Sequence, residues 1–137
     1  MTVRRMAGWI AQAAAVAAGL AFFGACRIER SPTGPICPAV VQRAIEVTVT
    51  DQATGAPAAA GAVGTLRDGP YAETMQAVGF TNGVATTLGG ATGRPGLYDV
   101  RVEKAGYQPW EAIGVRSESD ACGVRTVPLT AALHTAP

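Results

Sequence analysis

The residues of this 137-residue chain that could take part in catalysis are few and widely spaced. The sole histidine, His134, lies three residues from the C-terminus, and no Cys/His pair, GxSxG or HExxH motif is present. Asp99 and Glu103 would share one face of a strand about 13 Å apart by strand rise. A glycosidase pair needs roughly 5 to 9.5 Å, so a solvated charge ladder with Arg101 between them is expected. The sequence predicts neither enzymatic activity nor a bound metal or other cofactor.

Three aromatic side chains, Tyr71, Tyr107 and Trp110, are candidate ligand contacts. Such rings bind sugars and peptides, and Trp110 follows Pro109 in an expected turn. The alternative is that the rings cap the ends of a small core, since only 6% of the residues are aromatic. Both interpretations stay open, and the scarcity of large side chains favours packing.

The charge balance argues against nucleic acid as a partner. The formal net charge is +1, and without residues 1–25, which contain Arg4 and Arg5, nine basic side chains face ten acidic ones. Binding to a phosphate backbone requires a basic surface, and none is indicated.

Residues 1–25 have the pattern of a signal peptide, which would be helical. Arg4 and Arg5 precede a fifteen-residue apolar run from Trp9 to Phe23 that only Gln12 interrupts. This run is shorter than the roughly 20 residues of a spanning helix. Cleavage after Ala25 would put Phe23 at position −3, where an ordinary cleavage site has a small residue.

Phe23-Gly24-Ala25-Cys26 resembles the lipobox of bacterial lipoproteins, although that family usually has leucine in place of Phe23. The resemblance implies that Cys26 is lipidated, becomes the mature N-terminus and anchors the protein in a membrane. Arg27 follows, and the absence of aspartate there implies sorting to the outer membrane, with the protein facing the periplasm or the cell surface. A free or disulfide-bonded Cys26 is the alternative.

Residues 26–39 are predicted to be a linker. The stretch from Arg27 to Pro38 contains three prolines, a glycine and three charges, a composition that disfavours regular structure. If Cys26 is acylated, Cys37 and Cys122 remain as an even pair in an oxidising compartment. A disulfide between them is the simple expectation.

Residues 40–134 alternate between short strand patterns and turn residues. The clearest strand is Gly96 to Glu103, in which Tyr98, Val100 and Val102 alternate with charged residues, and Ile45 to Val49 has the same period of two. Val124 to Leu133 is a further strand, placed at a sheet edge or bulged because Pro128 has no amide donor.

The connecting stretches are less clearly patterned. A strand is expected within residues 58–67 without a defined register, and residues 71–78 read as an alternating run or a short helix. Thr81-Asn82-Gly83 predicts a hairpin turn, whereas the four glycines of residues 89–96 predict a loop. About seven short strands in one antiparallel β-sandwich are expected.

The order and spacing of these pieces resemble the carboxypeptidase regulatory-like domain. The matching segments are IEVTVTDQATGAP at 45–57, DGPYAET at 68–74, TNG at 81–83, PGLYDVRVEKAGYQPW at 95–110 and VRTVPLTAAL at 124–133. The resemblance implies a transthyretin-like, prealbumin-type sandwich. Members of that family are accessory modules of peptidases and envelope proteins, or free-standing lipoproteins, without catalytic residues of their own.

Together these features predict a non-catalytic lipoprotein of the cell envelope. Its sandwich would be a structural or binding module with an envelope protein or glycan as partner. The alternative is an accessory subunit of an envelope complex that pairs with its partner through an edge strand, such as the one containing Pro128.

Overall fold

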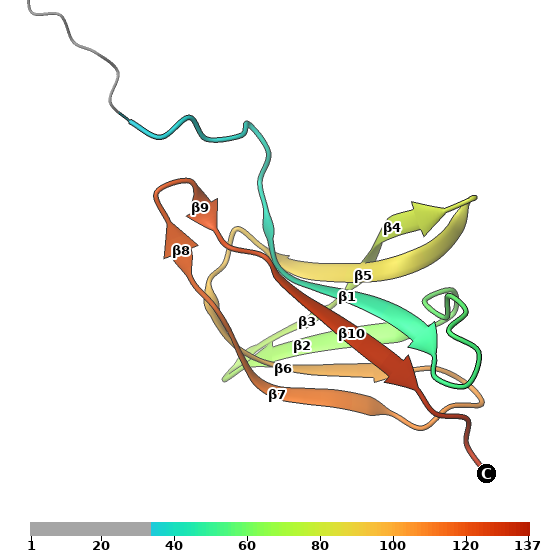
Figure 1. The fold of residues 1–137 in the computed structure, drawn as a ribbon. Coiled ribbons are helices and arrows are strands. Elements are labelled where there is room, and N and C mark those ends of the chain that lie inside the picture. Colours follow the sequence, from blue (N-terminus) through green and yellow to red (C-terminus); the bar gives the residue numbers. More distant parts are fainter. Residues whose placement is uncertain (1–33) are drawn as a thin grey trace, which may run out of the picture. The chain divides into compact units, whose positions relative to one another are not determined.

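The strands of the protein form two four-stranded sheets that pack face to face (Figure 1). The computed structural model describes residues 34–137. Sheet A has the order β10-β1-β5-β4, sheet B has the order β3-β2-β6-β7, and β8 and β9 pair separately. The ten strands are β1 Arg43–Asp51, β2 Val63–Asp68, β3 Tyr71–Thr74, β4 Gln76–Thr81, β5 Val84–Thr92, β6 Gly96–Glu103, β7 Trp110–Ser117, β8 Ser119–Asp120, β9 Gly123–Val124 and β10 Val127–Leu133. The predicted all-β sandwich is confirmed for this part of the chain.

The core lies between the sheets and is built mainly by β1 and β6. Every second side chain of these two strands is at most 1% exposed, namely Ile45, Val47, Val49, Tyr98, Val100 and Val102. Full burial of one aliphatic side chain contributes about 1.5 to 3 kcal/mol relative to exposure. The period of two in the sequence therefore identified the inner faces of both strands correctly.

Sheet A is mixed, which corrects the expectation of a purely antiparallel sandwich. Strand β10 runs parallel to β1, from Ile45 beside Val127 to Asp51 beside Leu133. A tight hairpin turn forces antiparallel pairing, but β10 follows β7 of the opposite sheet through the β8–β9 hairpin. No such turn constrains its direction. Pro128 lies in β10, an outermost strand, as predicted.

Residues 71–78 form no helix. They belong to two strands in different sheets, β3 in sheet B and β4 in sheet A. Met75, between the two strands, is where the chain leaves one sheet and joins the other. Met75 is 5% exposed and its backbone N–H donates to the carbonyl of Gly64. The suggested short helix was wrong. In the sequence these residues look like one continuous segment, but the buried Met75 divides them into two strands of different sheets.

The prediction of a loop over residues 89–96 was also wrong, because β5 continues to Thr92. Gly89 and Gly90 lie where β5 packs closely against its neighbours. A Cβ atom on Gly89 would come within 2.6 Å of Cδ of Arg43, and one on Gly90 within 2.8 Å of Cδ1 of Leu66. These glycines permit close packing in a strand, and the loop is confined to residues 93–95.

Two further local features are settled. In β2, Val63 is 51% exposed and Leu66 is fully buried, which fixes the register that the sequence left open. The turn at residues 82–83 is confirmed, since Asn82 and Gly83 have φ values of 51° and 78° and directly connect β4 to β5. Both central residues of a type I′ hairpin turn require such positive φ.

Candidate functional site

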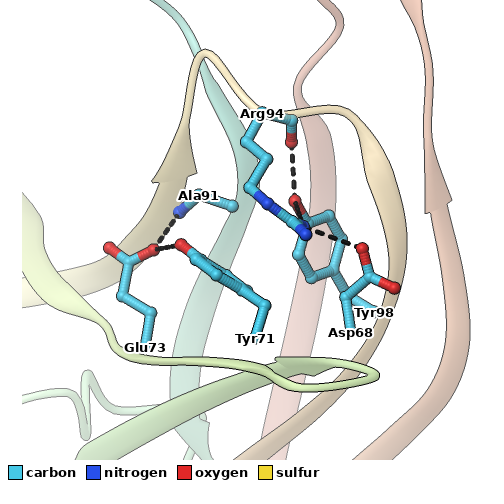
Figure 2. Close-up of polar contacts among 6 residues, drawn as sticks. All are labelled: Asp68, Tyr71, Glu73, Ala91, Arg94 and Tyr98. Carbon is cyan, nitrogen blue, oxygen red and sulfur yellow. Dashed lines mark hydrogen bonds and ion pairs between the residues drawn. The ribbon is translucent and has the colours of Figure 1, made fainter.

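A cluster of polar and aromatic side chains gathers where β5 turns into β6 (Figure 2). Tyr98 is fully buried, and its hydroxyl donates to the carbonyl of Arg94 over 2.6 Å. Nη1 of Arg94 donates in turn to the Tyr98 hydroxyl, 3.1 Å away, and to Oδ2 of Asp68, 2.7 Å away. The connection between β5 and β6 is thereby tied to the end of β2.

The same cluster extends to β3 through Tyr71 and Glu73. The guanidinium carbon of Arg94 lies 4.0 Å from the centre of the Tyr71 ring, a cation–π contact. The Tyr71 hydroxyl donates to the Glu73 carboxylate, which also accepts the N–H of Ala91 over 2.8 Å. The hydrogen bond to Glu73 is the main cause that raises the pKa of Tyr71 to about 12.

This cluster holds backbone groups of the β5–β6 connection in place. Ala91 has φ of +55°, an unusual value for a residue with a Cβ atom, and its N–H is held by Glu73. Among the described residues that are not exposed, every fully buried side-chain nitrogen or oxygen atom has a hydrogen-bond partner. The cluster is therefore a structural clamp on the β5–β6 connection.

Tyr107 and Trp110 lie at the other end of β6. The Tyr107 hydroxyl donates to Oδ2 of Asp51 over 2.8 Å, and Nζ of Lys104 lies 5.6 Å from the centre of its ring. This hydrogen bond raises the pKa of Tyr107, and it is the main cause that lowers the pKa of Asp51. Trp110 pairs with the buried Val102, and the half-buried ring packs against the core.

The three predicted ligand contacts thus do not form one platform. Tyr71 pairs with Asp68, next to the start of β6, whereas Tyr107 and Trp110 follow the end of β6. All three rings pack against the core while remaining partly exposed. This arrangement favours the packing interpretation, and a ligand on any one ring would have to bind at one end only.

The outer face of sheet B carries the charge ladder predicted for β6. Nη2 of Arg101 lies 2.7 Å from Oε1 of Glu103, and its other terminal nitrogen pairs with Glu111 of β7. The pKa of Arg101 is raised, mainly by the hydrogen bond to Glu103. Asp99 accepts the N–H of Gly114 over 3.0 Å. A shallow depression of about 340 Å³ lies over this ladder, bordered by Thr65, Arg67 and Ile113.

His134 is exposed and directly follows β10. Its backbone carbonyl accepts the N–H of Gln108, and Ala136 donates to the carbonyl of Gly106. The residues after β10 are therefore paired with the segment after β6. Within residues 34–137, no three His, Cys, Asp or Glu side chains come together to hold a metal ion.

Cys37 and Cys122 form a disulfide bond, as predicted, with their Cα atoms 5.1 Å apart across 85 residues of sequence. The bond attaches the irregular segment before β1 to the turn between β8 and β9.

Cys26, the predicted lipidation site, and the signal peptide of residues 1–25 lie outside the described residues. In the range from 34 to 137 there is no helix long and apolar enough to cross a membrane.

Neither the known protein families nor the curated proteins include a match to this chain. The resemblance to the carboxypeptidase regulatory-like domain therefore stays a prediction.

The side chains of the cluster that were not predicted from the sequence are Asp68, Glu73 and Arg94. One signal pointed to Arg94, since a tyrosine near the start of a strand can hydrogen-bond to backbone a few residues upstream, as in a tyrosine corner. The same signal does not indicate Asp68 or Glu73, which lie on other strands.

Proposed function

We propose that this protein is a non-catalytic lipoprotein of the bacterial cell envelope whose β-sandwich is a structural or binding module. The observation that carries the proposal is the disulfide between Cys37 and Cys122. Disulfides persist in oxidising compartments and are rare in the cytosol. An exported domain agrees with the signal-peptide pattern of residues 1–25 and with the lipobox-like sequence ending at Cys26.

The charged groups of the domain support a non-catalytic role. Arg94, Arg101 and Asp51 are engaged with partners inside the domain. Catalytic acids and bases are instead left poised toward a cleft, with pKa values shifted toward the working pH. Here the hydrogen bonds move the pKa of Tyr71 to about 12, away from neutrality.

Mass spectrometry of the mature N-terminus tests the lipid anchor. We expect the mature chain to begin at Cys26 and to carry a diacylglyceryl modification, which anchors more firmly with each added acyl chain. In Cys26→Ser the chain should leave the membrane fraction while the sandwich still folds. An unmodified N-terminus at another residue would refute the lipoprotein proposal.

The second candidate is an accessory subunit that pairs with an envelope protein through an edge strand. It is favoured by the presence of outermost strands in both sheets, β10 and β4 in sheet A and β3 and β7 in sheet B. A pull-down from detergent-solubilised envelope separates the two. A stoichiometric partner favours the accessory subunit, and its absence favours a module that acts alone.

A further inference from the structure

Strand β4 presents an open edge of sheet A. It is the outermost strand in the order β10-β1-β5-β4, and β5 is its only strand partner among residues 34–137. An outermost strand leaves one row of backbone N–H and C=O groups directed away from the sheet. This row is a template on which another extended chain can add.

The other three edges carry features that discourage pairing. Strand β10 contains Pro128 and contacts β7 of the opposite sheet. Strand β7 bears Glu111 and Arg116. Strand β3 has only four residues. Charges, proline and short length all protect sheet edges.

Strand β4 has neither a charge nor a proline. The whole stretch between Glu73 and Arg94 is uncharged, so neither β4 nor β5 has an ionised side chain. At the tip of their hairpin, Phe80 is 61% exposed and Val84 is 47% exposed. Strand β1 pairs with β5 only as far as Thr87, so residues 84–86 extend past it, and Figure 1 shows the hairpin projecting from the sheet.

The backbone of Phe80 faces outward. A two-residue turn makes Thr81 and Val84 the pair that exchanges both hydrogen bonds, so the next pair, Phe80 and Ala85, directs its N–H and C=O groups away from each other. The register shifts near Gly79 and is restored at Phe80. The strand therefore reaches the turn in its original register despite the local irregularity.

We propose that two copies of this chain pair through β4, antiparallel across a two-fold axis. Two-fold pairing places the same segment on both sides, and an uncharged segment can do this without bringing like charges together. The two copies of sheet A would become one continuous sheet, and Phe80 of each copy would lose exposed apolar surface. An interface of one strand pair is small, and small interfaces are typical of weak or transient association.

Cysteine cross-linking of the full-length chain tests this pairing. Each residue from Gln76 to Thr81 is replaced in turn by cysteine, except Gly79, where a Cβ atom would come within 2.8 Å of the Thr87 side chain. The background is Cys26→Ser, so that the disulfide-bonded Cys37 and Cys122 are the only other cysteines. Only positions near a two-fold axis face their own copies, so we expect disulfide-linked dimers from one or two adjacent positions. Ile113→Cys, on the exposed outer face of β7, is the control and should remain monomeric. Equal cross-linking at all positions would refute the proposal.

Phe80→Pro supplies the matched test of the backbone. Proline removes the outward amide donor and leaves the hydrogen bonds to β5 intact, so cross-linking at the reactive position should fall at least about tenfold. Phe80→Thr, which keeps the donor and a strand-forming side chain, should retain more cross-linking than Phe80→Pro. Unchanged cross-linking in Phe80→Pro, or no dimer at any β4 position, would overturn the proposal. These cross-linking results do not depend on whether Cys26 carries lipid, because the variants are made in the Cys26→Ser background.

Discussion

The hydroxyl group of Tyr98 donates a hydrogen bond to the backbone carbonyl of Arg94, 2.6 Å away and four residues earlier in the chain. This bond folds the β5–β6 connection back onto the buried ring. It also sets the position from which the Arg94 side chain reaches Asp68 and covers Tyr71. One tyrosine thus couples the connection after β5, the end of β2 and the beginning of β3.

Tyr98→Phe should destabilise the domain without changing its fold. The ring still fills the core, but the Arg94 carbonyl loses its donor, and loss of a partly buried hydrogen bond costs about 1 to 2 kcal/mol. Urea unfolding monitored by circular dichroism measures this change. An unfolding midpoint equal to that of the unmodified protein would show that the bond contributes nothing.

Trp110→Ala should lower the free energy of unfolding by about 2 to 3 kcal/mol, less than for a fully buried tryptophan because the ring is half-exposed. Ile113→Ala is the matched control, because it lies on the same strand but is 71% exposed, and it should change stability by no more than about 0.5 kcal/mol. Loss of binding to envelope glycan or protein with an unchanged melting temperature would instead identify Trp110 as a ligand contact.

The stability of the domain should fall as the pH rises from about 10 to about 12. The folded pKa of Tyr71, about 12, lies above the ordinary tyrosine value of 10.0 because its hydroxyl donates to Glu73. The fold therefore favours the protonated form, and this stabilisation is complete below pH 10 and is lost as the pH passes through the folded value. In Tyr71→Phe this part of the alkaline decline should be absent.

Absorbance at 295 nm during an alkaline titration measures the tyrosine ionisation directly. The Tyr71→Phe variant should lack the transition that occurs near pH 12. Tyr107→Phe is the comparison, since the pKa of Tyr107 is raised by a different carboxylate, that of Asp51. If Tyr71→Phe removed a transition near pH 10, the hydrogen bond to Glu73 would not exist in solution.

Replacing both Cys37 and Cys122 by serine should destabilise the domain substantially. For a sequence separation of 85 between the cysteines, the chain-entropy model gives about 4 to 5 kcal/mol as an upper estimate. We expect a smaller loss, because Cys37 lies before β1 in an irregular segment that can detach without disturbing the sheets. Thiol titration of the native, non-reduced protein should find neither cysteine free, and reaction of both would exclude the bond.

Gly90→Ala should destabilise the domain even though alanine favours an ordered chain. The added Cβ would lie 2.8 Å from Cδ1 of Leu66, a fully buried side chain, and overpacking of a core costs about 1 to 3 kcal/mol. Gly34→Ala is the control, because nothing lies within 4 Å of that position. Thermal unfolding of both variants checks the difference, and equal melting temperatures would contradict the close packing of β5 on β2.

The sequence predicted most of what depends on neighbours along the chain. Alternation identified the buried faces of β1 and β6, Asn82-Gly83 identified the hairpin, and Pro128 identified an edge strand. Cysteine counting, with Cys26 set aside as the lipidation site, indicated the pair that forms the disulfide, although its members are 85 positions apart. The other signals depend on backbone conformation or composition within a short window, where a single sequence is informative.

The sequence misled where distant segments decide the outcome. Gly89 and Gly90 were predicted to lie in a loop because glycine is common in turns. They lie in a strand instead, where the side chains of Arg43 and Leu66 leave no room for a Cβ atom. The parallel direction of β10 depends on which sheet its predecessor belongs to, which local patterns do not encode. The separation of Tyr71 from Trp110 likewise follows from the pairing of strands, which places Tyr71 near the start of β6 and Trp110 near its end.

By itself, then, the sequence determined the inward and outward faces, the turns and the all-β class, because these follow from local propensity and a period of two. Only the tertiary structure decided that Arg94 meets Asp68 and Tyr71, and that β4 is an outermost strand of the sheet formed by residues 34–137. Those contacts join residues from different strands, and the order of strands in a sheet is fixed by the packing of the whole core rather than by any one segment.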